Sequence, residues 1–191
     1  MTIQALFGIG AGILQLVTCG MYIASILKGE TRPDRVTWWV IAFVNGIITA
    51  AYFAAGARET IWLPLAYGAG FGLIALLSLK YGEGPFRLSI IDRISLFGTL
   101  ISGAIWWLVH SPVLVLLMNI VTEFIGLIPT INKSYRRPWT ESKSAWVLAT
   151  IASLLNVCAV TEWSLGIAAY PIYVLVTNIL ITCSILRKRD V

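Results

Sequence analysis

Seven apolar segments of about 20 residues, separated by short charged stretches or by proline and glycine, dominate this chain of 191 residues. An α-helix needs about 20 apolar residues to cross roughly 30 Å of hydrocarbon, whereas a barrel would need alternating apolar and polar residues. The chain is 58% hydrophobic and 12% charged, and soluble domains carry roughly a quarter charged residues. The sequence therefore predicts an all-α integral membrane protein. Its expected spans are 3–27, 36–56, 61–80, 93–109, 112–131, 144–161 and 163–186.

The basic residues predict how these spans are oriented. All of the fourteen Lys and Arg except Arg58 follow the first, third, fifth or seventh segment. Because cytoplasmic loops are rich in Lys and Arg, we expect a multi-pass protein of the cell (plasma) membrane with its N-terminus outside and its C-terminus in the cytoplasm. The cations lie in short runs between apolar segments, so the expected partner is the lipid bilayer and not nucleic acid.

Few residues in the sequence could support bond-making chemistry. The three cysteines, Cys19, Cys158 and Cys183, fall inside apolar segments, where they act as small hydrophobic residues. The single histidine, His110, lies in a turn, and no H-E-x-x-H, phosphate-binding loop, C-x-x-C or G-x-S-x-G pattern is present. We therefore expect a protein that is not an enzyme and that uses no cofactor or metal.

An internal repeat relates the two ends of the chain. IASILKGETRP (23–33) aligns without a gap to IPTINKSYRRP (128–138), and a proline recurs further on, as Pro64 and Pro171. The alignment predicts two parallel three-helix bundles joined by a linker helix, because the odd fourth span gives both bundles the same direction. The expected units are 1–82 for the first bundle, 83–110 for the linker and its helix, and 111–191 for the second bundle.

This plan and two local stretches resemble a known family. LIPTINKSYRR resembles the PQ-loop signature, in which a proline precedes a short basic loop, and WSLGIAAYPIYVLVTN (163–178) resembles the last helix of the same family. The chain is thus similar to a divergent, prokaryotic-type member of the SWEET and PQ-loop (MtN3-saliva) superfamily of seven-helix membrane transporters. The resemblance implies that Asn178 faces a central cavity and contacts the substrate. The first repeat has Phe71 at the aligned position.

Glu123 is the only acidic residue well inside an expected span. An ionised carboxylate at mid-depth costs on the order of 2.5–3.5 kcal/mol on insertion scales, and burial favours its neutral form. Such a group suits proton or cation coupling, or recognition of a cationic or hydroxylated solute. The alternative is a neutral glutamic acid that hydrogen-bonds between helices. Asn119 lies one helical turn away on the same face.

Asparagines recur in other spans, where each can either bridge two helices or line a wet cavity. The expected substrate-binding residues are Glu123, Asn119, Asn178, Asn156 and Asn45.

The prolines could influence helix movement. Pro129 is expected to kink its span and act as a hinge. For Pro64 and Pro171 the alternative is that each begins a helix, where proline is well tolerated.

Together these features predict a membrane transporter, either a uniporter or proton-coupled, for a small polar solute such as a sugar, an amino acid or a related metabolite. Alternating access between the two bundles would move the solute. The alternative function is a receptor or assembly protein of the PQ-loop fold that binds a ligand or peptide without moving it. A homo-oligomer is compatible with either function.

Overall fold

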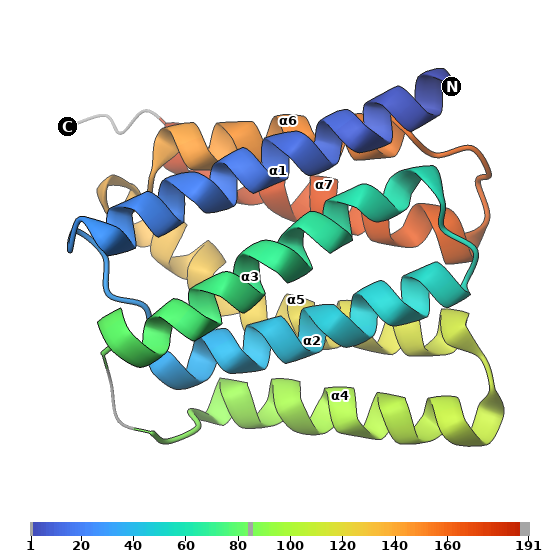
Figure 1. The fold of residues 1–191 in the computed structure, drawn as a ribbon, viewed down its shortest axis with the longest axis horizontal. Helices are drawn as coiled ribbons and strands as arrows, with labels where there is room; N and C mark the ends of the chain where they lie inside the picture. The colour runs from blue at the N-terminus through green and yellow to red at the C-terminus, as the bar shows by residue number, and fades with distance from the viewer. Residues whose placement is uncertain (1, 84–85, 188–191) are drawn as a thin grey trace.

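The computed structural model describes residues 2–83 and 86–187, apart from the side chains of Pro129 and Thr140. Within this part the chain forms seven α-helices that run alternately in opposite directions (Figure 1). An isolated bridge between Asp34 and Glu83 is the only β-type pairing there. The all-α fold class is therefore confirmed. The helices are α1 (Ile3–Leu27), α2 (Arg35–Ala54), α3 (Trp62–Tyr81), α4 (Ile90–Val109), α5 (Pro112–Arg136), α6 (Lys143–Cys158) and α7 (Leu165–Leu186), with short 3-10 turns η1 (Glu59–Ile61) and η2 (Pro138–Thr140).

Two helices are longer than their apolar segments predict. α4 begins at Ile90 because Ser89 and Asp92 form a capping box that satisfies backbone N–H groups of the first turn. α5 continues past the expected end at 131 as far as Arg136, which places Lys133 and Arg136 at its C-terminal end. Cations are favourable there because the helix dipole is negative at its C-terminus.

Six of the helices are long and apolar enough to cross a membrane, and α6 is the shorter exception with 16 residues. At 1.5 Å per residue α6 is about 24 Å long, somewhat less than the hydrocarbon thickness. Large apolar side chains such as Leu6, Phe97 and Leu180 point outward, whereas asparagines and threonines lie inside. This distribution fits a multi-pass membrane protein, because lipid solvates the apolar exterior and the polar side chains are kept away from the lipid.

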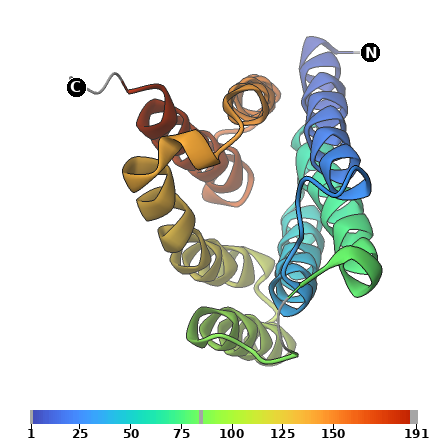
Figure 2. The same ribbon diagram turned by 90° about the vertical axis from the view of Figure 1, so that its left-hand side faces the viewer.

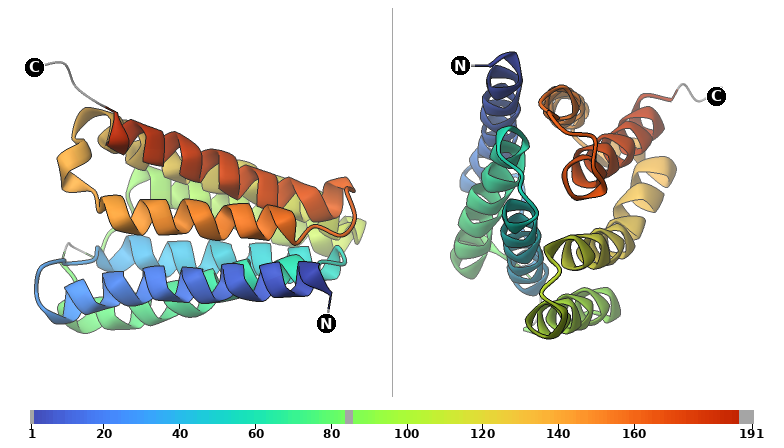
Figure 3. Two further views of the ribbon diagram at one scale, coloured as in Figure 1. Left: turned by 90° about the horizontal axis from the view of Figure 1, so that it is seen from above. Right: turned by 90° about the vertical axis from the view of Figure 1, so that its right-hand side faces the viewer.

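The helix contacts close a ring. Going around it, α1 packs against α3, α3 against α2, α2 against α5, α5 against α7, α7 against α6, and α6 against α1. Figure 2 looks along the helices and shows α1, α2 and α3 on one side and α5, α6 and α7 on the other. α4 lies outside the ring, against α5 and α2, and the two views of Figure 3 show the same arrangement from above and from the opposite end.

Glycines allow α1 to approach α3 and the turn before it. A Cβ on Gly8 would overlap the carbonyl of Glu59, and one on Gly12 would lie 2.9 Å from the carbonyl oxygen of Trp62. Further along, a Cβ on Gly70 would overlap the side chain of Cys19. The small-residue packing expected for membrane helices is thus present at this interface.

The two ends of the bundle differ in charge and packing. We call the end at which α1, α3, α5 and α7 finish the basic end, because Lys28, Lys80 and Lys133 lie there and Arg58 lies at the opposite end. The buried apolar core is densest toward the opposite end. Its members there include Ile48, Tyr52, Ala57, Leu63, Val115, Leu116, Val160, Ile167 and Tyr170.

Candidate functional site

Glu123 lies near the middle of α5 and is only partly exposed. Its Oε2 atom is buried and finds no hydrogen-bond partner among the described residues. The ion pair of the described chain lies elsewhere, between Lys133 and Glu141. A buried carboxylate oxygen without a partner is costly, so this group is available to pair with something that enters the bundle.

Three tyrosines on two other helices lie in the neighbourhood of this carboxylate. The phenol groups of Tyr67 on α3 and of Tyr170 and Tyr173 on α7 lie within electrostatic range of Glu123. The rings of Tyr170 and Tyr173 have their centroids 6.3 Å apart, and neither hydroxyl finds a partner among the described residues. Tyr170 is fully buried. The site therefore combines one carboxylate with two unpaired phenols of α7 and, from the other side of the ring, the phenol of Tyr67.

Asn178 belongs to the same region of the bundle. It lies on α7 and interacts with the phenol of Tyr67, and its Nδ2 donates to the carbonyl oxygen of Ala149 on α6 at 3.2 Å. One amide thus joins α6 to α7 and also contacts a residue of α3. Because α3 and α7 lie on opposite sides of the ring, this side chain is directed toward the ring's interior.

An aromatic row continues from this cluster toward the basic end. Tyr67 and Phe71 on α3 have centroids 5.0 Å apart, Phe71 lies 5.6 Å from Trp38 on α2, and Trp38 lies 5.2 Å from Tyr22 on α1. All four side chains are partly exposed. The row links the middle of the ring to its basic end through three helices of one side.

Asn119 points in a different direction from Glu123. It is fully buried, and its Nδ2 donates to Ser102 Oγ on α4 at 2.6 Å and to the carbonyl oxygen of Val115 at 2.9 Å. A Cβ on Gly98 of α4 would lie 2.8 Å from Thr122 Oγ1, so Thr122 also lies against α4. The structure thus places Asn119 between α4 and α5, whereas Glu123 lies toward α3 and α7.

The remaining two expected asparagines lie in the protein interior. Asn45 on α2 is buried with its oxygen directed at Gly68 of α3, since a Cβ there would lie 3.4 Å from it. Asn156 on α6 is fully buried. Neither amide finds a hydrogen-bond partner among the described residues. No contact that the structure describes joins either of them to Glu123.

A hydrogen bond joins α2 to α7 at the end of the bundle opposite the basic end. Pro171 lies inside α7 and not at its start, so the carbonyl of Ile167 lacks the N–H that residue 171 would normally supply. Tyr52 Oη on α2 lies 2.7 Å from this carbonyl oxygen and donates to it, and 2.6 Å from Thr60 Oγ1. The freed carbonyl therefore becomes the acceptor of a bond across the ring. Pro64, in contrast, lies in the first turn of α3.

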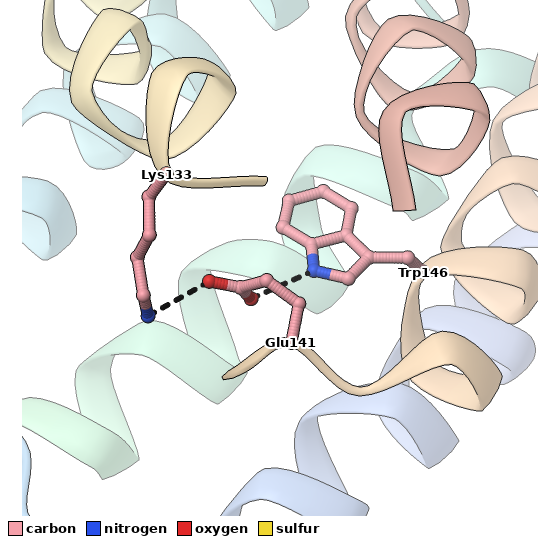
Figure 4. A network of polar contacts seen from close by, with 3 residues as sticks. All are labelled: Lys133, Glu141 and Trp146. Carbon is pink, nitrogen blue, oxygen red and sulfur yellow. Dashed lines mark hydrogen bonds and ion pairs between the residues drawn. The ribbon is translucent and has the colours of Figure 1, made fainter. Parts of the chain in front are cut away.

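Polar contacts at the basic end hold α5, α6 and α7 together. Glu141 Oε1 pairs with Lys133 Nζ at 2.8 Å, and its Oε2 accepts a hydrogen bond from Trp146 Nε1 at 3.1 Å (Figure 4). The guanidinium of Arg187 lies 3.9 Å from the ring centroid of Tyr135 and donates to its carbonyl oxygen. These contacts all lie within one side of the ring.

The structure therefore places Asn178 beside Tyr67 and Asn119 beside Ser102 of α4, and no contact among the described residues joins either asparagine to Glu123. The tyrosines were missed by sequence reasoning, although the spacing of Tyr170 and Tyr173 puts two phenols on one helical face. The hinge expected at Pro129 falls on a side chain outside the described residues, and α5 is helical through that position.

The chain matches no known protein family, no curated protein and no solved structure.

Proposed function

We propose that the chain is a membrane carrier for a small polar solute, and not an enzyme, with its binding site at Glu123, Tyr67, Tyr170, Tyr173 and Asn178. The observation that carries this proposal is a partnerless carboxylate oxygen in the middle of an apolar bundle, with unpaired phenol groups near it. Intramembrane ionisable residues generally mark substrate or proton pathways. Either a uniporter or a proton-coupled carrier agrees with such a site.

The proposed architecture is two parallel three-helix bundles, α1–α3 and α5–α7, joined by α4 as a linker, as in the SWEET and PQ-loop superfamily. The packing order supports it. α3 lies between α1 and α2, and α7 lies between α5 and α6. Between the halves, α1 packs against α6 and α2 packs against α5. A two-fold axis along the bundle that exchanges α1 with α5 and α2 with α6 would produce this pair of contacts.

Alternating access would then open the two ends of the ring in turn. The Tyr52 bond and the dense apolar core favour a closed end opposite the basic loops. The aromatic row from Tyr67 to Tyr22 would lead from the site to the basic end. With the basic end in the cytoplasm, this conformation faces inward.

Uptake into proteoliposomes tests the transport proposal. The purified chain is reconstituted, and uptake of radiolabelled sugars, amino acids and amines is measured with and without a pH gradient. We expect at least one solute to enter faster than into empty vesicles, and Glu123→Gln to reduce its uptake about tenfold or more, because a charged partner is lost. Glu162→Gln, an exposed carboxylate in the α6–α7 loop, serves as the control and should leave uptake unchanged.

The second candidate is a receptor or assembly protein of the same fold. The hydrogen bond from Tyr52 of α2 to the Ile167 carbonyl of α7 favours it, since a bond between the two sides of the ring would oppose their relative movement. It is the better description if the purified chain binds a solute that never enters the vesicles.

A further inference from the structure

The charge balance around Glu123 limits what can bind there. Lys and Arg occur at the ends of the described helices, and the nearest one along α5 is Lys133. Ten residues separate it from Glu123, which is about 15 Å along a helix, and its ammonium pairs with Glu141 at 2.8 Å. The carboxylate therefore has no protein cation beside it on its own helix. A bound positive charge would compensate it, and a neutral solute would not.

The neighbours of Glu123 favour a particular kind of cation. Aromatic faces attract ammonium groups, and tyrosine rings are common members of such cages. Hard metal ions instead take six to eight oxygen ligands in the case of calcium, and the described residues contain no cluster of three His, Cys, Asp or Glu that could hold a metal. One carboxylate among Tyr67, Tyr170 and Tyr173 fits an organic ammonium ion better than a metal ion.

We infer that the solute is a small organic cation, a quaternary ammonium compound, whose charge pairs with the partnerless Glu123 carboxylate in the neighbourhood of Tyr67, Tyr170 and Tyr173. This inference rests on the carrier site proposed above and names its substrate class. The aromatic row of Phe71, Trp38 and Tyr22 gives a cation a succession of π faces between the site and the basic end.

Binding to the purified full-length chain in lipid nanodiscs tests the inference. The probes are choline, tetramethylammonium and 3,3-dimethylbutan-1-ol, an uncharged molecule with the shape of choline, measured by titration calorimetry. We expect both cations to bind and the neutral alcohol to bind at least about tenfold more weakly, the difference expected when the charge is lost.

Two matched pairs of variants distinguish the contribution of the Glu123 charge from that of the Tyr173 ring. Glu123→Gln keeps the size of the side chain and should weaken choline about tenfold or more, while Glu162→Gln leaves binding unchanged. Tyr173→Leu should weaken choline more than Tyr173→Phe does, because phenylalanine keeps the π face. Thermal unfolding of each variant confirms that it is folded.

The outcomes distinguish this inference from the transport proposal. If neither cation binds, or if the neutral alcohol binds as well as choline, the organic-cation inference is wrong, and uptake of a neutral solute would leave the carrier proposal intact. If choline binds through Glu123 but does not enter proteoliposomes, the substrate class is supported and the carrier proposal fails.

Discussion

At the scale of single residues, Pro171 determines which group can join the two sides of the ring. Its missing N–H leaves the Ile167 carbonyl without an intrahelical donor, and the Tyr52 hydroxyl supplies one from α2. A buried carbonyl without a donor is costly. The stability of α7 and the closure of this end of the ring therefore depend on the same hydrogen bond.

Tyr52→Phe should lower the free energy of unfolding by about 1–2 kcal/mol, because the Ile167 carbonyl loses its donor. In a Pro171→Ala background the same change should cost less, since residue 171 then offers an N–H to that carbonyl. Unfolding in detergent by denaturant titration gives the four free energies of this double-mutant cycle.

Tyr81→Phe is the control for this cycle, because the Tyr81 ring lies beside Lys80 at the basic end of α3. It should have little effect in either background. Equal costs of Tyr52→Phe in the two backgrounds would contradict the link between Pro171 and Tyr52.

At the level of single residues, the sequence singles out Glu123 but does not predict which neighbours the side chains of its helix meet. Glu123 stands out because a carboxylate in an apolar span is rare and costly. Asn119, four residues earlier, was expected to share its site, yet its amide bonds to Ser102. The helical period places the two side chains on a similar face, but which neighbour each one meets depends on how α5 is rotated against α4 and α7.

At the scale of helices, the α1–α3 interface depends on the absence of side chains. Gly8 and Gly12 lie against the backbone of Glu59 and Trp62, which cannot move aside as a flexible side chain could. Gly20, on the same helix, has open space at the position of its Cβ. We therefore expect an added methyl group to destabilise the protein at Gly8 and not at Gly20.

Gly8→Ala should destabilise the protein by about 1–3 kcal/mol, because the added methyl group forces α1 away from η1. Gly20→Ala should be neutral or stabilising by up to about 1 kcal/mol, since alanine favours helix without a clash. Denaturant titration in detergent measures both. A Gly8→Ala protein as stable as the original would refute the close approach of α1 to η1.

The apolar segments predict that each helix exists, but they predict its first and last residues less well. The start of α4 at Ile90 depends on the reciprocal hydrogen bonds of Ser89 and Asp92. The sequence pattern places the start of this span at 93, three residues later. The end of α5 was placed too early as well, because basic residues are compatible with a helix C-terminus.

At the scale of the whole molecule, the distribution of Lys and Arg predicts how the bundle sits in the membrane. If the basic end is cytoplasmic, a cysteine at position 162 should react with a membrane-impermeant maleimide on intact cells. A cysteine at position 30 should react only after the membrane is permeabilised. Both positions are exposed loop residues.

Gel-shift labelling of Glu162→Cys and Glu30→Cys measures this, in a background in which the native cysteines are replaced by alanine. Labelling of position 30 on intact cells would reverse the proposed orientation. The native cysteines to be replaced are Cys19, Cys158 and Cys183.

The repeat in the sequence predicts two groups of three helices, but it does not predict which helices of one group pack against the other group. Aligning 23–33 with 128–138 relates the end of α1 and the loop after it to the end of α5 and the loop after it. It contains no information on the contacts of α1 with α6 or of α2 with α5, because those contacts join residues that the alignment does not pair. The closure of the ring emerged only from the three-dimensional packing.

The position of α4 outside the ring affects the direction in which the later helices run. α4 packs against α2 and α5 from outside the ring and separates no ring helix from its neighbours. Its removal would nevertheless reverse the direction of every later helix, and α5 would then meet α2 with inverted polarity. Glu123, Tyr170 and Tyr173 would change their depths relative to Tyr67. In the proposed arrangement of two three-helix bundles, α4 is the span that keeps both bundles in the same direction.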